Sequence, residues 1–280
     1  QSKQTFRQNC GKSASLAWDL LYILIRHAKR VKEKGDFTMV YNLRDMSWSE
    51  FAERSKTAKT IIIPSGACEV YGRHLPLGSD ILVAKKVAEL VAEKVNGIVA
   101  PCVEIGQSKS LTSFPGTIAI SAATLTAVYR EMIDEFVRLG FKNFFVVNTH
   151  LHNTQPLTEV LVDAQLKHGI KYGQIGWWQY IPSFTSDLWE SPNPHGHAAE
   201  AGTSVLLYLF PELVHMEVAA STNSPFVNKW PGIVNCVKYA EHTDTGTLGD
   251  GTKGTVEKGR ITVERGVANI ADYIQNFMEK

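Results

Sequence analysis

Short apolar segments of strand length alternate with longer segments of helical character along most of the chain. Four segments are short, apolar and bounded by polar or turn-forming positions: 60–64, 98–103, 144–147 and 172–178. Segments that favour helices lie between or after them: 79–94, 122–139, 156–168, 200–209 and 256–278. Strands that alternate with helices build βαβ units, whose strands are parallel and buried on both faces. The pattern therefore predicts an α/β protein, a three-layer α/β/α sandwich with a mostly parallel central sheet.

The composition is that of a globular protein and argues against several classes of partner. Of the 280 residues, 44% are hydrophobic and 20% are charged, so the chain can bury a large core. A net charge of +1 gives no reason to expect nucleic acid, and the basic stretch 26–34 is interpreted as the solvated end of a helix. No segment reaches the roughly 20 apolar residues that a membrane span needs, so no membrane partner is expected.

Cysteine usage and the early apolar run together predict a cytoplasmic protein. The four cysteines form no CxxC pair, which argues against a disulfide framework and fits a reducing compartment. The apolar run 16–25 contains Asp19 and lacks the charged start and small-residue cleavage site of a signal peptide.

Residues 1–38 are predicted to form a helical arm in front of a core domain of residues 39–280. Ser13 can cap a helix over residues 16–34, whose end is crowded with Lys and Arg and is followed by Gly35. The alternative is a helix that packs on the same core, and the sequence does not choose between the two.

Histidine and carboxylate side chains gather in three loops at the ends of predicted elements. Two of these loops, 65–80 and 148–153, follow the first and third strands, and a third, 195–200, precedes a helix. Open α/β sheets bind ligands at the carboxyl ends of their strands, so we expect these loops to meet. The residues concerned are Glu69, Tyr71, His74, Asp80, His150, His152, His197 and Glu200.

This residue set is typical of a metal-dependent hydrolase. A divalent ion held by His and carboxylates lowers the pKa of a bound water to about 7 and acts as a Lewis acid toward a carbonyl. His and Asp/Glu ligands suit Zn²⁺ and Mn²⁺. Each residue also has an ordinary structural interpretation: Asp80 can be a helix cap, and Cys68 a small buried hydrophobe. The hypothesis of a site therefore depends on the joint pattern.

Several ordered motifs resemble those of the creatininase (creatinine amidohydrolase) family. The run 64–80, PSGACEVYGRHLPLGSD, resembles the family signature P-x-G-[ST]-x-E-x-H-G-x-H-L-P-x-x-x-D. Matches to later family elements follow in the same order: FPGT at 114–117, NTHLHN at 148–153, HAAEAGTS at 197–204, GD at 249–250 and EKG at 257–259. The resemblance covers about residues 40–275 and leaves residues 1–38 unexplained.

The resemblance implies a metal site with one departure that bears on ion number. By position, Glu69, Asp80 and His150 correspond to the ligands of one ion, and Asp80 would bridge to a second. The other ligands of that second ion correspond to Tyr71, where the family has His, and to His152, where it has a carboxylate. Either one ion is bound, with His152 as a fourth ligand, or His74 replaces the lost histidine and two are bound.

The resemblance also implies roles around the ion. Glu200 or His197 would carry a proton from water to the leaving group, and Tyr71 would donate to the developing oxyanion. Substrate contacts are predicted for His74, Arg73, Trp177 and Trp178. Gly202 stands where the family usually has Glu, and together with Tyr71 and Arg73 this puts creatinine itself in doubt as the substrate.

The leading functional hypothesis is a metal-dependent hydrolase that opens a cyclic amide or cleaves an amide bond of a small polar substrate. The alternative within the hydrolases is carbon–carbon ring opening of a cyclic polyol ketone such as an oxidised inositol. A cysteine hydrolase using Cys68, His74 and Glu69 and a non-catalytic metal-binding relative are further alternatives. The resemblance also implies a homo-oligomer, often a hexamer in this family.

Overall fold

The computed structural model describes residues 41–222 and 238–280, which belong to one compact unit that begins at Tyr41. The predicted arm, residues 1–38, and its helix lie outside the described residues, so the arm stays a prediction. Among the described helices, none combines the length and apolarity that crossing a membrane requires.

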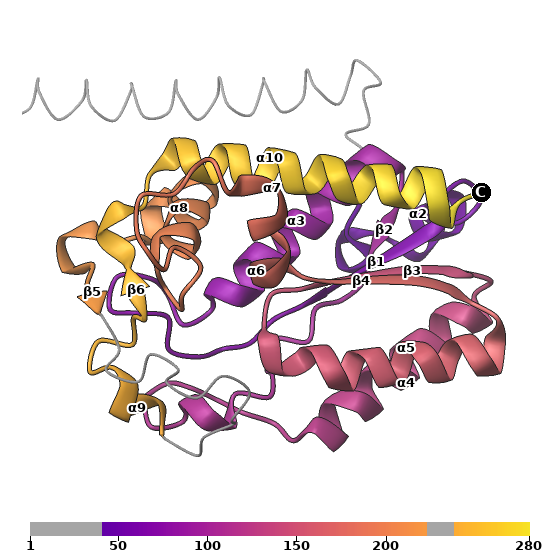
Figure 1. The fold of residues 1–280 in the computed structure, drawn as a ribbon. Coiled ribbons are helices and arrows are strands. Elements are labelled where there is room, and N and C mark those ends of the chain that lie inside the picture. The colour runs from indigo at the N-terminus through magenta and orange to yellow at the C-terminus, as the bar shows by residue number, and fades with distance from the viewer. Residues whose placement is uncertain (1–40, 223–237) are drawn as a thin grey trace, which may run out of the picture. The chain divides into compact units, whose positions relative to one another are not determined.

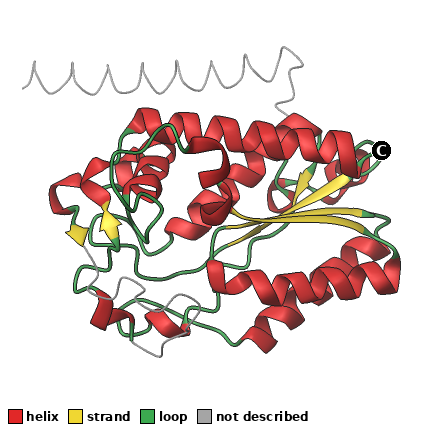
Figure 2. Ribbon diagram, in the orientation of Figure 1, coloured by secondary structure: helices red, strands yellow, loops and turns green. Residues whose placement is uncertain are grey.

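A four-stranded parallel sheet forms the centre of the unit, as the alternating pattern predicts (Figures 1 and 2). The strands run in the order β2-β1-β3-β4, and both central strands are almost wholly buried. Apolar runs suit such strands because helices cover both faces of the sheet. The bounds are β1 Thr60–Ser65, β2 Ile98–Val99, β3 Asn143–Asn148 and β4 Lys171–Gly176.

Helices cover the two faces of the sheet and complete three layers (Figure 1). On one face, α3 (Ser79–Val95), α8 (Glu200–Leu209) and α10 (Val256–Tyr273) pack in a cluster with Ile62 and Phe145. On the other face, α4 (Ala122–Arg138) and α5 (Thr154–His168) pack with Ile61 and Phe144. Neighbouring strand residues thus point to opposite cores, as the period-two geometry of a strand requires. The predicted fold class is confirmed.

Two strand predictions are too long at their carboxyl ends. The predicted strand 98–103 keeps only Ile98–Val99, because Pro101 has no backbone N–H to continue a ladder; Val103 makes one isolated bridge to Ser65. The predicted strand 172–178 ends at Gly176, and the two tryptophans begin a short helix instead.

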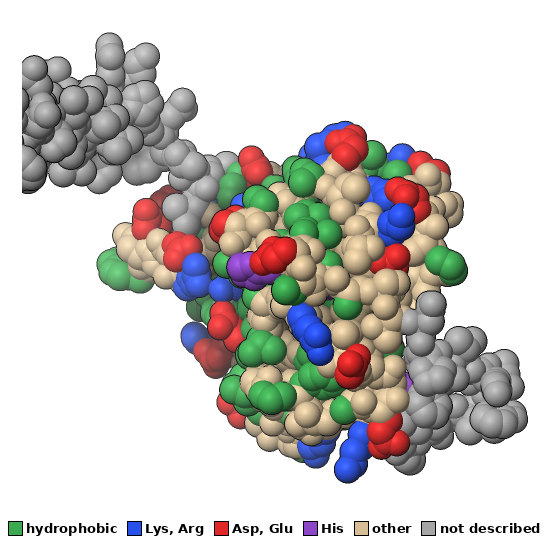
Figure 3. All heavy atoms as spheres, turned by 90° about the vertical axis from the view of Figure 1, so that its left-hand side faces the viewer, with side chains coloured by type: hydrophobic (Ala, Val, Ile, Leu, Met, Phe, Trp, Pro, Cys, Tyr) green, Lys and Arg blue, Asp and Glu red, His purple; other side chains and the backbone are tan. Residues whose placement is uncertain are grey.

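Short elements connect the main ones. The remaining α-helices and strands are α2 Trp48–Arg54, α6 Trp177–Tyr180, α7 Pro182–Thr185, α9 Tyr239–His242, and the antiparallel pair β5 Ser221–Thr222 and β6 Gly249–Asp250. Single 3₁₀ turns cover Leu43–Asp45, Lys109–Leu111, Leu151–Asn153 (η3), Pro211–Leu213, Met216–Val218 and Gly251–Lys253, and a π-turn at Ile274–Met278 ends α10. On the face of the molecule in Figure 3, basic and acidic side chains are interspersed.

Candidate metal centre

Three of the predicted ligands converge at the carboxyl end of the two central strands. Glu69 lies in the loop after β1, Asp80 in the first turn of α3, and His150 directly after β3. The last residues of β1 and β3 pair with one another, so these loops start side by side. One ligand atom from each residue lies within 4.8 Å of the others, and the three residues are 2%, 1% and 4% exposed.

Close backbone packing holds the loop after β1 against α3. Gly66 lies so near the helix that a Cβ atom there would be 2.8 Å from the backbone carbon of Asp80, which no side chain could tolerate. Thr149 Oγ1 donates to the carbonyls of both Ser65 and Asp80. The residue that caps α3 is Gly78, without a side-chain hydrogen bond. The carboxylate of Asp80 is therefore not a helix cap but is directed to the cluster.

His150 is oriented for coordination through its Nδ1 atom. Nδ1 lies 3.1 Å from Glu69 Oε2 and 3.4 Å from Asp80 Oδ2, while Nε2 donates to the Gln107 carbonyl at 3.2 Å. Burial lowers the pKa of His150, but the hydrogen bonds and charges of Asp80 and Glu69 outweigh it and raise the pKa to about 10. Metal-binding histidines typically donate their other N–H to a carbonyl or carboxylate in this way.

Each carboxylate has a partner that fixes its orientation. Ser108, fully buried, donates to Glu69 Oε2 at 2.5 Å, and Trp178 Nε1 donates to Asp80 Oδ1 at 3.0 Å. Burial raises the pKa of Glu69, but hydrogen bonds and charge from His150 outweigh it, so the pKa is lowered. Burial raises the pKa of Asp80 to about 6, so Asp80 is ionised at neutral pH. Two carboxylates and one imidazole fit Zn²⁺ or Mn²⁺.

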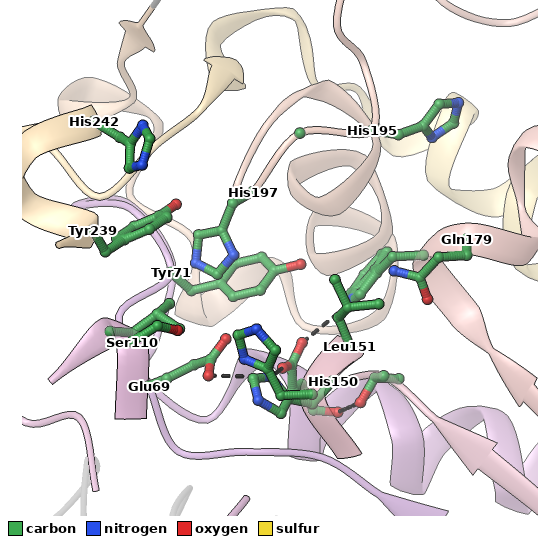
Figure 4. Close-up of a pocket in the computed structure, with 16 residues that line it drawn as sticks. Glu69, Tyr71, Ser110, His150, Leu151, Gln179, His195, His197, Tyr239 and His242 are labelled. Carbon is green, nitrogen blue, oxygen red and sulfur yellow. Dashed lines mark hydrogen bonds and ion pairs between the residues drawn. The ribbon is translucent and has the colours of Figure 1, made fainter. Parts of the chain in front are cut away.

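The cluster opens into a cavity of about 360 Å³. The fourth predicted ligand, His152, also lines this cavity, together with Tyr71, Trp178 and His197, which were predicted for catalysis or substrate contact. Figure 4 shows Tyr71 and His197 beside Glu69 and His150. His152 lies on η3 with an exposed side chain and is outside the three-donor cluster. Residues that the sequence analysis did not single out also line the cavity: Ser110, Leu111, Thr149, Leu151, Gln179, His195, Gly196, Tyr239 and His242.

His197 is placed to act as a base. Its Nε2 donates to the Val70 carbonyl at 2.7 Å, which leaves Nδ1 as the proton acceptor. Among the residues that the structure describes, none hydrogen-bonds Nδ1. The ring lies between Tyr71 and Tyr239, with centroids at 4.5 and 5.3 Å. Burial lowers the pKa of His197, so the imidazole is neutral at neutral pH.

Tyr71 presents a phenol to the same cavity. Its side chain is 4% exposed and its ring centroid lies 6.0 Å from that of Trp178. Burial, followed by the charges of Asp80 and Glu69, raises the pKa of Tyr71 well above its ordinary value. Tyr71 is therefore a protonated hydrogen-bond donor beside the carboxylates.

Three residues predicted to contact substrate lie away from the cavity wall. Arg73 is exposed and donates to the Asp244 carbonyl at 3.4 Å. His74 is buried, and its Nε2 shares a 2.8 Å hydrogen bond with Thr203 Oγ1; burial lowers its pKa to about 4. Trp177 is fully buried in the core beside Gly266 of α10, because large aromatic surfaces favour burial over exposure.

Glu200, predicted as a proton carrier, also lies away from the cavity. Its carboxylate accepts hydrogen bonds from the backbone N–H groups of Glu190 and Ser191, and it forms a 2.6 Å ion pair with Lys258 Nζ. The side chain of Glu200 is fully buried, and Lys258 lies on α10. These contacts fasten the loop that carries His195 and His197 to α10. The contacts of Glu200 are thus structural, whereas His197 lines the cavity.

Substitution of Glu200 by alanine is expected to lower the free energy of unfolding by about 3–5 kcal/mol, because it leaves Lys258 without its buried partner. The matched control is Glu190→Ala, which removes an exposed carboxylate from the same lysine and should cost no more than about 1 kcal/mol. Denaturant unfolding of both variants measures the difference. Equal, small losses in the two variants would contradict this structural task.

Ser108, which contacts a predicted ligand, and Tyr239, which lines the cavity, are site residues that the sequence does not predict. Ser108 follows β2, whose carboxyl end lies at the same edge of the sheet as that of β1, so the strand pattern favours a place near the site for polar residues of this loop. Tyr239 and His242 lie on α9, far along the chain from any strand end, and no motif marks them. Only the folded chain places them at the cavity.

Comparison with known proteins agrees with these observations. A sequence model of the creatininase family, described as creatinine amidohydrolase, matches residues 44–274. The creatinine amidohydrolase of Pseudomonas putida is 27% identical over 82% of this chain and 95% of its own length. A mycofactocin precursor peptide peptidase of Mycolicibacterium smegmatis is 28% identical over 78% and 85%. A 3-dehydro-scyllo-inosose hydrolase of Thermotoga maritima is 26% identical over 87% and 85%.

Solved structures of creatininase share the fold. A creatininase mutant of Zn-Zn type superimposes with a TM-score of 0.76, at 25% identity, over 86% of this chain and all of that one. A manganese form of creatininase gives a TM-score of 0.75 with the same identity and coverage. The match of the family model over most of the chain, on the fold and ligand cluster described above, shows that the chain belongs to the creatininase family.

Proposed function

We propose that the chain is a metal-dependent amidohydrolase that opens a cyclic amide or cleaves an amide bond of a small polar substrate. The observation that carries the proposal is the buried cluster of Glu69, Asp80 and His150 at a cavity that also presents the neutral imidazole of His197. Three protein ligands with an open side toward a cavity are typical of a catalytic ion rather than a structural one.

The chain divides the chemistry among a few side chains. A bound divalent ion supplies a Lewis acid for the substrate carbonyl and lowers the pKa of water to about 7. His197 Nδ1 accepts a proton from the attacking water and returns it to the leaving nitrogen, since its Nε2 is already held by Val70. Tyr71 Oη donates to the substrate oxygen as negative charge develops there. Ser108 and Trp178 keep the two carboxylates in place.

The cavity supports a small substrate with polar groups. Its volume of about 360 Å³ is at the lower end of the range for small-molecule sites, about 300–1,000 Å³. Aromatic rings of Tyr71, Trp178 and Tyr239 give flat walls, and Gln179 and His195 add hydrogen-bonding groups away from Glu69 (Figure 4). A planar or cyclic polar molecule matches this combination.

Ring opening of a cyclic polyol ketone by carbon–carbon hydrolysis is the second candidate. The Thermotoga maritima relative named a 3-dehydro-scyllo-inosose hydrolase aligns with 87% of this chain, which favours this candidate. Attack of water on a ketone needs the same Lewis acid and base. The two candidates differ in product, since only amide cleavage breaks a C–N bond and frees a nitrogen, either as a released amine or within the ring-opened product.

A cysteine hydrolase built on Cys68 has little support. Cys68 Sγ points to the Gly116 carbonyl at 3.9 Å, and the residue does not line the cavity. Burial, followed by the charges of Glu69 and Glu104, raises the pKa of its thiol and disfavours the thiolate that attack requires.

We also infer a homo-oligomer in a reducing, cytoplasmic setting. The family resemblance supports the homo-oligomer. The two described cysteines, Cys68 and Cys102, are both free, which fits a reducing compartment.

An assay of the purified chain with Zn²⁺ or Mn²⁺ tests the proposal. Substrates should include creatinine, other small cyclic amides, N-acyl amines and cyclic polyol ketones, with separate detection of released amine and of new carboxylate. We expect turnover of an amide with stoichiometric new amine or amino product, abolished by a chelator and restored by the ion. New carboxylate from a ketone without amine would establish the second candidate, and turnover insensitive to the chelator would refute both.

A further inference from the structure

Two positions at which the chain departs from the family motifs lie in contact. Tyr71 stands where the motif has His, and Gly202 stands where it has Glu. A Cβ atom on Gly202 would lie 3.2 Å from both Oη and Cε1 of Tyr71. Because residue 202 has no side chain, the Tyr71 phenol has room beside α8. The two departures from the family motifs are therefore linked: Gly202 accommodates Tyr71.

The oxygens of Asp80 already have separate partners. Oδ2 faces His150 Nδ1 at 3.4 Å, within the three-donor cluster, whereas Oδ1 accepts the 3.0 Å hydrogen bond from Trp178 Nε1. The Trp178 N–H occupies one lone pair of Oδ1 and competes there with a second ion, so this hydrogen bond favours coordination of one ion through Oδ2. Asp80 is thus arranged to serve one ion.

The described residues hold no second group of three converging donors beside the cavity. In residues 41–222 and 238–280, Glu69, Asp80 and His150 form the single group of three His, Cys, Asp or Glu donors that converge on a point. Tyr71 offers a phenol, whereas Zn²⁺ and Mn²⁺ prefer imidazole and carboxylate ligands. His152, His195, His197 and His242 also line the cavity, but none of them belongs to a group of three converging donors.

We propose that this chain holds one divalent ion, on Glu69, Asp80 and His150, and that Tyr71, accommodated by Gly202, takes the place of a second ion as a hydrogen-bond donor to the substrate. The creatininase of Zn-Zn type, which shares the fold, carries two. The inference rests on the proposed metal-dependent function and deepens it, because it assigns the ion number and the residue that replaces the second ion.

Metal stoichiometry tests the proposal without reference to activity. The full chain is stripped with a chelator, titrated with Zn²⁺ or Mn²⁺ by calorimetry, and analysed for metal per chain after dialysis. We expect one ion per chain. Two ions would overturn the inference and leave the proposed function standing, whereas no bound ion would overturn the proposed function itself.

Variants of the pair identify the cause of the single ion. Tyr71→His with Gly202→Glu supplies an imidazole and a carboxylate able to orient it, and should bind a second ion. The matched control Tyr71→Phe should keep one ion while kcat falls about 100-fold, as when one oxyanion donor is lost. If the double variant is folded by circular dichroism and still binds one ion, Tyr71 and Gly202 are not the cause of the single ion. Two ions bound to Tyr71→Phe would contradict the proposal in the same way, and this test does not depend on whether the double variant folds.

Discussion

Replacement of His150 by alanine is expected to abolish binding of the divalent ion and nearly all turnover. His150 supplies the only imidazole of the three-donor cluster, and its loss leaves Glu69 and Asp80 as two buried carboxylates without a cation between them. The Lewis acid is worth several kcal/mol of transition-state stabilisation, so kcat/KM should fall about 1,000-fold or more. Metal content per chain and steady-state rates measure the two effects together.

The control for this prediction is the same substitution at an exposed histidine. His215 is 66% exposed at its side chain and forms an ion pair with the exposed Glu217, so His215→Ala should change neither metal content nor rate. Full metal occupancy in His150→Ala would show that the ion binds elsewhere and would remove the basis of the proposed site.

Replacement of His197 by alanine is expected to lower kcat by about 100- to 10,000-fold while the ion stays bound. That range is typical for the loss of a general acid–base group. His197 is not a member of the three-donor cluster, so metal content should match that of the unmodified chain. Added imidazole should restore part of the rate, because the substitution leaves a space of that shape beside Tyr71 and Tyr239.

The matched control is His195→Ala, at the other histidine of the same loop. His195 lines the cavity but lies apart from Glu69 and His150 (Figure 4), so its loss should affect KM more than kcat. An unchanged kcat in His197→Ala, with the protein folded and the ion bound, would show that another group moves the proton.

Most of the fold could be predicted from the sequence because burial leaves a clear pattern. The wholly buried strand β1, with Ile61, Ile62 and Ile63 at its centre, and the amphipathic helix α4 follow directly from the alternation of segments. Element ends were less predictable. Pro101 ends β2 early. The residue types at Trp177 and Trp178 are compatible both with the end of a strand and with the first turn of a helix, so the sequence does not distinguish the two.

The candidate site was predictable where its residues end strands and not elsewhere. Glu69, Asp80 and His150 converge because β1 and β3 are neighbours, which the strand pattern implies. The family motif predicts a chemical task for Glu200, but its carboxylate pairs with Lys258, which lies 58 residues further along the chain. Such a pairing depends on how α8 packs against α10, and a one-dimensional pattern does not contain it.

The parallel order of the sheet also sets when the site comes into being. Glu69 and Asp80 both follow β1, whereas His150 follows β3 after a long connection, so β1 must already pair with β3 before the three donors can meet. Non-local parallel pairings form slowly, and an ion that binds only the finished site cannot assist them. An ion that binds only the folded chain therefore lowers the rate of unfolding and leaves the rate of folding unchanged.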